Sequence, residues 1–540
     1  YHDGQPMSPA EKHFVRTELL PEHHAPSSLA AHVARLEARL GRRGDTLDVM
    51  AMTSALLARP DRDEARRRDF RSLRMITVDS ASTVEIDDGL SAEVAGVDDV
   101  HGDVSLVRVF VHVADPTRYL DAEDGLAKVA SGRVRTLYLP HGKRPMLPVA
   151  LGAEACSLLE GVGVPSLTVT AVVRLEDGSL VEGSGEVVMS VTQSSGRMTY
   201  DEVDRALEGA DGCAPPKSTQ TTGALLSLLS AVAAARKRWR TGQMGPAAQA
   251  ASGARGAETG ATDATDATEA TEATEATEAT ILAVPGPGDA GAEHGEMTVT
   301  MTHAPKSSPS RELVMECMVL AGQVLATFGL ENAIPLPYRS QEAVAYDPDG
   351  DEDDDKRNSV QLSDYRLRRY LLRSTLAASP DFLDPSRYAH HALGVPAYTQ
   401  ATSPIRRYVD LLAHWQIKAH LRGEGQGGNE GGTLAFDRDQ LDAAIVALER
   451  TNQALTAAER AIDQAFLCAY AQTLPDPKTL PSCTLLHWIN QERGLGILHV
   501  PVLGRDLVAT LNRPAAVGTQ LSCTVTAADP FTGTLVLTAD

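Results

Sequence analysis

Residues 75–90 read MITVDSASTVEIDDGL, and the rest of the chain can be interpreted around this stretch. It opens with Met75–Val78, a short apolar run rich in β-branched residues, which predicts a buried strand. A small polar segment then predicts a turn or loop, and Gly89 permits a close turn or bulge. Four carboxylates lie within ten residues here: Asp79, Glu85, Asp87 and Asp88.

Carboxylates this close repel one another, which costs Coulomb energy unless cations neutralise them. Hard divalent ions, Mg2+ above all, prefer such oxygen ligands. Paired metal ions can clamp the attacking and leaving oxygens of a phosphodiester during in-line hydrolysis. A solvated acidic loop or a structural calcium loop is the alternative for an acidic cluster taken alone. The acidic spacing of an EF-hand does not fit this stretch.

The string DSASTVEIDDGL resembles the signature of the ribonuclease II (RNB) exoribonucleases. Further strings match in the order of that family, and TSPIRRY is the most specific of them. The matching strings are VHVADPT (111–117), TLYLPHGKRPMLP (136–148), ACSLL (155–159), RELVMECM (311–318) and YTQATSPIRRYVDLLAHWQIKAHL (398–421). Together they span about residues 66 to 475, which is most of the chain.

The resemblance implies a 3′→5′ exoribonuclease that hydrolyses single-stranded RNA to nucleoside 5′-monophosphates with Mg2+, for which Mn2+ can substitute. It assigns the four carboxylates of residues 79–88 to metal ions, with Asp87 the acid whose loss stops turnover. Arg406 then lies near the scissile phosphate and Tyr138 stacks on the terminal base. The predicted RNA-binding residues are Tyr138, Glu316, Arg406, Arg407 and Glu459.

Two departures from the family pattern keep other functions open. Bacterial members usually have Asp where this chain has Glu85, which is one methylene longer. The region 239–251 lacks the Phe that pairs with the base-stacking tyrosine, so either Trp239 substitutes or half of the clamp is missing. One alternative is therefore a catalytically weak RNB-fold RNA-binding protein. A second is a metal-dependent nuclease acting on DNA.

The TSPIRRY segment predicts the start of a helix. Thr402 or Ser403 is the expected cap, with Pro404 at the first helical position. Arg406 and Arg407 then fall in the first turn, where the helix dipole disfavours cations. Their presence is explained if an anion such as a phosphate docks at that N-terminus.

The expected fold class is α+β, with an RNB catalytic domain made of a mixed sheet surrounded by helices. Residues 1–65 predict a helical N-terminal region, with helices from Ser27-Ser28 to Leu40 and from Thr46 to Ala58, the second capped by Asp45. Residues 66–475 form the catalytic domain. Its predicted insertions are a disordered low-complexity segment at about 245–296 and an acidic loop at 347–356. Residues 480–540 predict an OB-fold RNA-binding barrel.

Two polar features have two interpretations each. Asp115, at the end of the predicted strand Leu106–Val113, supports either the metal or substrate site, or caps the following turn. The predicted helix 222–239 has a basic end, which is either a solvated terminus or a rail for RNA and consists of Arg236, Lys237, Arg238 and Arg240.

The net charge of −22 is unexpected for a protein that grips RNA, although thirteen acidic residues fall in segments 263–278 and 347–355. RNA binding therefore needs a local basic channel and metal ions.

The six cysteines are scattered, so the sequence predicts neither a zinc site nor a disulfide framework. This pattern indicates a reducing compartment. Leu225–Ala235 is the nearest apolar run to a membrane span and is too short. We expect an intracellular monomer, in an organelle or the cytoplasm. The chain starts at Tyr1 and not at Met, so we expect it to be a fragment or a processed form.

Overall fold

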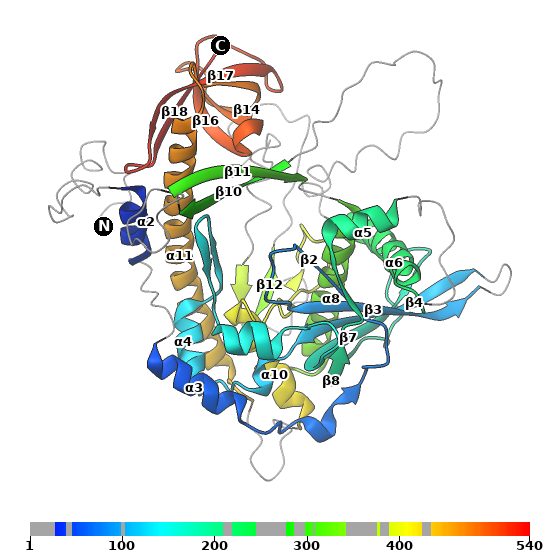
Figure 1. Ribbon diagram of the computed structural model, residues 1–540. Helices are drawn as coiled ribbons and strands as arrows, with labels where there is room; N and C mark the ends of the chain where they lie inside the picture. Colours follow the sequence, from blue (N-terminus) through cyan, green and yellow to red (C-terminus); the bar gives the residue numbers. More distant parts are fainter. Residues whose placement is uncertain are drawn as a thin grey trace, which may run out of the picture.

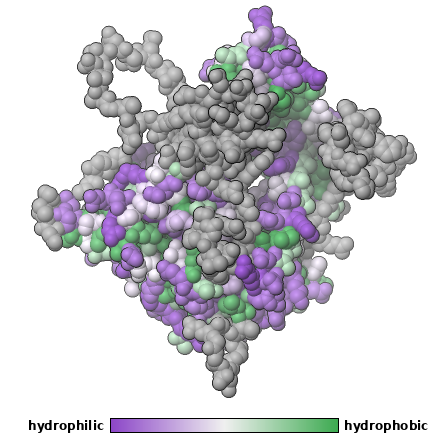
Figure 2. Space-filling model, turned by 180° about the vertical axis from the view of Figure 1, so that it is seen from behind, coloured by the Kyte–Doolittle hydropathy of each residue, from purple (hydrophilic) through white to green (hydrophobic). Residues whose placement is uncertain are grey.

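A computed structural model of the chain shows a sheet-and-helix body joined by one long helix to a small barrel (Figure 1). The structure describes residues 28–38, 46–98, 103–208, 219–244, 277–285, 297–305, 308–341, 375–377, 388–423 and 434–540. The predicted acidic loop 347–356 lies outside these residues. On the face seen in Figure 2, hydrophilic residues are interspersed with small hydrophobic patches over the described surface.

The body is built on a seven-stranded sheet in the order β1-β8-β7-β4-β3-β2-β9. Pairs β1–β8 and β2–β9 are parallel and the other neighbours are antiparallel, so the sheet is mixed. The strands are β1 (Arg68–Asp69), β2 (Ile76–Asp79), β3 (Asp88–Val97), β4 (Val104–Ala114), β7 (Gly163–Arg174), β8 (Glu186–Gln193) and β9 (Gly196–Thr199).

One face of the sheet is covered by helices α5 (Tyr200–Leu207), α6 (Thr222–Gln243) and α8 (Pro309–Glu331). The run LVRVFVHV supplies alternate valines of β4, among them Val107, Val109 and Val111, to the core beneath α6 and α8. Burial of this apolar surface is the main stabilising contribution to the body. The predicted mixed sheet surrounded by helices is confirmed.

Helix α8 is the one described helix that is long and apolar enough to cross a membrane by length and composition. Its apolar window is 72% buried inside the protein, as expected of a core helix. The sequence indicates a largely buried helix over Ser310–Phe328, but the choice of Leu225–Ala235 as the apolar run nearest to a membrane span was wrong. Glu312 and Glu316 interrupt the apolar pattern near its start.

The second core lies around helices α3 (Leu47–Leu57), α4 (Gly125–Arg133), α10 (Tyr408–Leu421) and α11 (Arg438–Thr473). Helix α11 presents the predicted stripe to this core, and all five of its members are buried: Leu441, Ile445, Leu448, Leu455 and Ile462. The same helix continues to the barrel and packs on β17 (Gln520–Asp529) (Figure 1). The long helix therefore connects the two parts of the molecule.

The C-terminal strands close into a five-stranded barrel in the order β14-β15-β16-β18-β17. The other four strands are β14 (Thr479–Asn490), β15 (Leu495–Val500), β16 (Arg505–Leu511) and β18 (Thr534–Ala539). This closed barrel is the OB-like fold predicted from the short strands and turns of residues 480–540.

The N-terminal helices differ from the prediction in one detail. Ser28 caps α2 (Leu29–Ala38) by accepting from the Ala31 N–H at 3.2 Å, as expected. The second helix is capped by Thr46, not Asp45, because the Thr46 hydroxyl accepts from the Val49 N–H. Leu40, the predicted end of the first helix, lies outside the described residues.

The prediction of a disordered insertion at 245–296 is wrong for Thr277–Pro285. These residues form β10, which pairs in antiparallel fashion with β11 (Met297–Pro305). Ile281 and Ala283 of β10 are buried in the second core, and their burial accounts for order in a segment that begins inside the repeat. Residues 245–276 and 286–296 lie outside the described part of the chain.

Candidate active site

The acidic stretch is folded around the ends of two strands. Asp79 ends β2 and Asp88 begins β3, while the carbonyl of Asp87 accepts the Ala114 N–H at 2.8 Å. The loop between them is held by Ser157 of the ACSLL string, whose hydroxyl accepts from the Ile86 N–H at 3.1 Å and donates to the Val84 carbonyl at 3.2 Å. These contacts bring Asp79, Asp87 and Asp88 to one end of the sheet.

Gly89 has a different role from the predicted turn. It lies inside β3, where a Cβ would come within 2.8 Å of the Met75 sulfur. The residue is therefore required by the close packing of the strand against Met75.

The three aspartates are held in surroundings that disfavour their charge. Burial and the neighbouring Asp87 raise the pKa of Asp79 to about 6. Burial raises the pKa of Asp87 to about 7, with Arg406 opposing the rise. Burial and Asp79 raise the pKa of Asp88 to about 7. A cation placed among them would stabilise the ionised forms.

Arg406 approaches the acids through a turn that precedes α10. The Asp87 carboxylate accepts the Ile405 N–H at 2.9 Å, and the Arg406 Nε lies 3.1 Å from its second oxygen. The Arg406 guanidinium also donates to the Ser403 hydroxyl at 2.9 Å. Arg406 is thus held beside Asp87, and its role at the scissile phosphate stays a prediction.

The prediction that Arg406 and Arg407 lie in the first helical turn is wrong. Helix α10 begins at Tyr408, and Arg407 is its extended N-cap residue. Arg407 pairs as a β-bridge with Arg135, and the Thr136 N–H donates to the Arg406 carbonyl at 2.9 Å. This long-range pairing keeps both arginines out of the helix, which local caps alone do not reveal.

Glu85 has a lysine as its partner. Its side chain is only 3% exposed, and one of its oxygens lies 2.9 Å from Lys143 Nζ. That oxygen lacks an aligned hydrogen bond, so the contact is an ion pair defined by charge and distance. The fourth predicted metal ligand therefore already has a cationic partner.

Tyr138 projects from a hairpin made of β5 (Leu137–Leu139) and β6 (Gly142–Arg144). Its side chain is 59% exposed, which is unusual for a large aromatic residue and suits a stacking surface. The hairpin is anchored from the flanking elements, since Glu37 of α2 pairs with Arg144 and the Ala283 N–H of β10 donates to the Pro140 carbonyl. The exposed ring is therefore presented on a rigid support.

Glu316 and Glu459 do not reach the group formed by the aspartates and Arg406. Glu316 is 1% exposed in α8, and its oxygen accepts from Arg240 Nε at 2.9 Å. Glu459 of α11 pairs with Arg135, and the Arg135 Nη1–Oε1 distance is 2.9 Å. Contact of either acid with RNA stays a prediction. Each carboxylate would have to bind RNA while it also pairs with its arginine.

The basic end of α6 fits the solvated-terminus interpretation only in part, because Lys237 and Arg238 are exposed. Arg236 and Arg240 are buried, and Arg236 donates to the Gly178 carbonyl at 2.8 Å and to Gln323. These arginines tie α6 to α8 and to the β7–β8 connection. Trp239 is the candidate to replace the missing clamp Phe. The guanidinium of Arg236 lies over its ring, 4.4 Å from the ring centroid.

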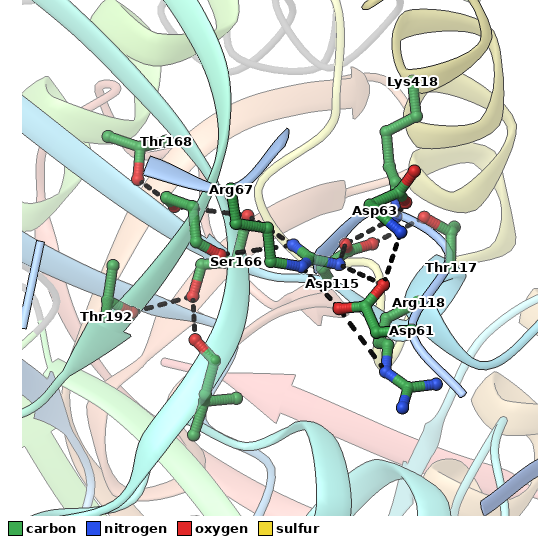
Figure 3. A network of polar contacts seen from close by, with 12 residues as sticks. Asp61, Asp63, Arg67, Asp115, Thr117, Arg118, Ser166, Thr168, Thr192 and Lys418 are labelled. Carbon is green, nitrogen blue, oxygen red and sulfur yellow. Dashed lines mark hydrogen bonds and ion pairs between the residues drawn. The ribbon is translucent and has the colours of Figure 1, made fainter. Parts of the chain in front are cut away.

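Asp115 also has a role that neither interpretation anticipated. Its carboxylate accepts from Lys418 of α10 at 2.6 Å and from Arg67 at 2.9 Å, inside a buried network (Figure 3). Lys418 contacts Asp63 as well, at 3.1 Å. The side chains of Lys418, Asp63 and Asp115 are fully buried, and that of Arg67 is 2% exposed. The network fastens α10 to the end of β4, one residue beyond the partner of Asp87.

The donor set fits a hard divalent cation by its chemistry. The buried Asp87 and the partly buried Asp79 and Asp88 all have raised pKa values, and a cation among them would stabilise their ionised forms. In the part of the chain that the structure describes, no three acidic, His or Cys side chains already surround one point as a finished metal site. Asp79, Asp87 and Asp88 are therefore the residues that would hold Mg2+, with small adjustments of their side chains.

The structure adds residues that the sequence analysis missed. Lys143 lies opposite Tyr138 in the hairpin, a position that strand pairing of TLYLPHGKR would have indicated. Arg197 of β9 donates to the carbonyls of Ser80 and Thr83 and so shapes the acidic loop. Arg311 lies over the ring of Tyr200, 4.7 Å from its centroid. Nothing in the local sequence pattern marked the last two.

This combination of a mixed sheet, a closed terminal barrel, and carboxylates facing an arginine defines a nuclease-like protein of the RNB class. The family model for the RNB domain matches residues 67–423. The chain belongs to the RNB family.

Its relatives include characterised and uncharacterised ribonucleases. It is 30% identical over 471 residues to an uncharacterized ribonuclease of Synechocystis sp., covering 87% of this chain and 59% of that protein. It is 32% identical over 371 residues to the chloroplastic/mitochondrial ribonuclease II of Arabidopsis thaliana, covering 67% of this chain and 38% of that protein. The chain thus spans less than two thirds of the length of these relatives.

The fold is shared with solved structures at low sequence identity. Mycoplasma genitalium RNase R in complex with ribose methylated single-stranded RNA gives a TM-score of 0.68 at 16% identity, covering 95% of this chain and 78% of that chain. A yeast protein described as a pseudonuclease gives a TM-score of 0.54 at 15% identity, covering 86% of this chain and 54% of that chain. The fold alone therefore does not decide whether a member cuts RNA.

Proposed function

We propose that the protein is a 3′→5′ exoribonuclease that hydrolyses single-stranded RNA to nucleoside 5′-monophosphates. The observation that carries the proposal is the 3.1 Å contact of Asp87 with Arg406, with Asp79 and Asp88 close enough to interact electrostatically and with the exposed Tyr138 within reach of the same charges. Family membership and the ribonuclease relatives add support. The proposal extends to a monomeric protein, acting in RNA processing and decay in an organelle or the cytoplasm.

The residues of the site have separate tasks in this proposal. Tyr138 stacks on the terminal base, and stacking suits an enzyme that accepts every base. Arg406 stabilises negative charge that develops on the phosphoryl oxygens, and Asp87 orients Arg406 through the 3.1 Å contact. When bound, Mg2+ supplies the positive charge that offsets the carboxylates and activates water. Because water adds to phosphorus and the bond to the 3′ oxygen breaks, the released nucleotide keeps its phosphate on the 5′ oxygen.

The proposal is tested with 5′-labelled single-stranded RNA and Mg2+, comparing wild type with Asp87→Asn and a matched DNA. We expect wild type to shorten the RNA in single-nucleotide steps, DNA to persist, and Asp87→Asn to bind RNA without cutting it. Degradation of DNA at the same rate would replace the proposal with the metal-dependent DNA nuclease.

One observation favours the catalytically weak RNA-binding protein as the second candidate. Asp87 and Glu85 both have cationic protein partners, Arg406 and Lys143, which compete with metal ions. If wild type binds RNA at nanomolar to micromolar concentrations and leaves it intact at any Mg2+ or Mn2+ concentration, this second candidate is correct.

A further inference from the structure

The ion pair between Glu85 and Lys143 connects the acidic stretch to the Tyr138 hairpin. The Lys143 Nζ is 2.9 Å from the Glu85 carboxylate, and the Glu85 side chain is 3% exposed. In the hairpin, Lys143 is paired directly with Tyr138, and its Nζ lies 5.9 Å from the centroid of the tyrosine ring. A single lysine thus contacts both a predicted metal ligand and the predicted base-stacking residue.

The surroundings make this contact more than a surface ion pair. A carboxylate this deeply buried is unfavourable without a positive charge close by. Lys143 is itself only 27% exposed, so solvent screens the pair less than it screens exposed pairs such as Arg71–Asp69. The hairpin backbone is also held by the Arg144–Glu37 ion pair and by the Thr136–Arg406 hydrogen bond, which keep the start of the Lys143 side chain near Glu85.

The other carboxylates of the stretch stand in a different position. Repulsion makes it harder to ionise all three of the aspartates, Asp79, Asp87 and Asp88, together. The cations that oppose this repulsion are arginines. Arg406, in the turn before α10, pairs with Asp87 and is the cation that we expect to contact the phosphate. Glu85 differs from the aspartates in its ion pair with a lysine of the Tyr138 hairpin.

We infer that Lys143 is the resident counter-ion of Glu85, so that this site holds one divalent cation, on the three aspartates, and the Glu85–Lys143 pair instead positions the Tyr138 hairpin. The inference rests on the proposed function for the identity of the metal site. It also gives a physical reason for Glu at position 85, because its additional methylene extends the carboxylate toward the hairpin. Lys143 and Glu85 are positioning residues in this account.

The first test counts metal ions on the full chain by titration with Mn2+ and electron paramagnetic resonance of the free ion. We expect one equivalent for wild type and for Glu85→Gln, whose affinities should agree within about twofold. Asp88→Asn should bind at least tenfold more weakly. Lys143→Met should gain a second equivalent or bind Mn2+ at least threefold more tightly, because the Glu85 carboxylate is released.

Arg144→Met is the matched control for this titration. It removes the same charge from the adjacent residue, whose carboxylate partner is Glu37 and not Glu85. It should therefore bind Mn2+ as wild type does. Two equivalents on wild type, or a Lys143→Met titration that coincides with that of Arg144→Met, would overturn the inference.

A second test does not depend on metal and separates this inference from the proposed function. In EDTA, thermal unfolding is measured for Glu85→Gln, Lys143→Met and the double variant. If the two side chains form a pair, the double variant should unfold no lower than the less stable single variant. Additive shifts of the unfolding midpoint would refute the pair even if Mn2+ did not bind. Absence of Mn2+ binding with a coupled midpoint would instead refute the proposed metal site and retain the pair.

Discussion

Lys418 gives the sharpest prediction about what holds the candidate site together. It is fully buried in α10 and bridges Asp115 at 2.6 Å and Asp63 at 3.1 Å (Figure 3). Lys418→Met keeps the length and apolar character of the stem and removes only the charge. Breaking one partner out of a buried ion pair typically costs about 3–5 kcal/mol, because the remaining charge is left without compensation.

The structure narrows this range. After the substitution, Asp115 would keep Arg67 at 2.9 Å and Asp63 would keep Arg422 at 2.7 Å. Each carboxylate therefore retains one cation, and we expect a loss at the lower end, about 3 kcal/mol of unfolding free energy. Lys237→Met is the matched control, because its pair with Glu312 is exposed and should contribute under about 1 kcal/mol.

The assay is urea unfolding followed by the fluorescence of the three tryptophans, of which Trp415 lies in α10 and loses its 2.7 Å hydrogen bond to the Leu120 carbonyl on unfolding. We expect a clearly lower midpoint for Lys418→Met and almost none of this shift for Lys237→Met. Equal midpoints for wild type and Lys418→Met would refute the assignment of the network as a stabilising support of α10.

Three further predictions concern pH, RNA affinity and turnover. Burial lowers the pKa of His112 to about 3 from an ordinary 6.5, so the unfolded chain binds the proton first. Its contribution to stability is complete above pH 6.5 and falls as pH drops toward 3, by about 2 kcal/mol at pH 5, and His112→Gln should flatten this part of a stability–pH curve. Tyr138→Ala should weaken binding of single-stranded RNA roughly 5- to 150-fold in a filter-binding assay, from about 1–3 kcal/mol of stacking, whereas Tyr138→Phe should bind normally. Arg406→Met should lower kcat by about 100- to 1000-fold with little change in RNA affinity, and a kcat within threefold of wild type would contradict its role at the phosphate.

The sequence predicted those parts of the fold that depend on local pattern. The apolar run of β4, the stripe of α11 and the strand-and-turn spacing of the barrel each follow from which residues need burial. The order of the motif strings indicated the RNB family, and the family model agrees.

The errors share a physical cause, which is contact between segments far apart in the chain. The β10 strand is stabilised by pairing with β11 and by burial of Ile281. The start of α10 is set by the bridge between Arg135 and Arg407. Asp115 has its partner Lys418 about three hundred positions away, and no local rule for caps or turns contains that information.

The sequence predicted which residues form the candidate site better than it predicted how they contact one another. Asp79, Asp87, Asp88 and Arg406 come together as the resemblance implies, although their roles remain proposals. Glu85 was expected beside them, and its pairing with Lys143 depends on the hairpin placement. Side-chain partners of this kind follow from tertiary structure and not from motif spacing.

The most direct test of the central claim follows the first product from a single-stranded RNA radiolabelled at the phosphate between its last two nucleotides. With wild-type protein and Mg2+, the account predicts that the label appears first in a nucleoside 5′-monophosphate, in step with unlabelled RNA that is one nucleotide shorter. Label released first in a longer oligonucleotide, or recovered as a 3′-phosphate, would contradict 3′→5′ hydrolysis at this site.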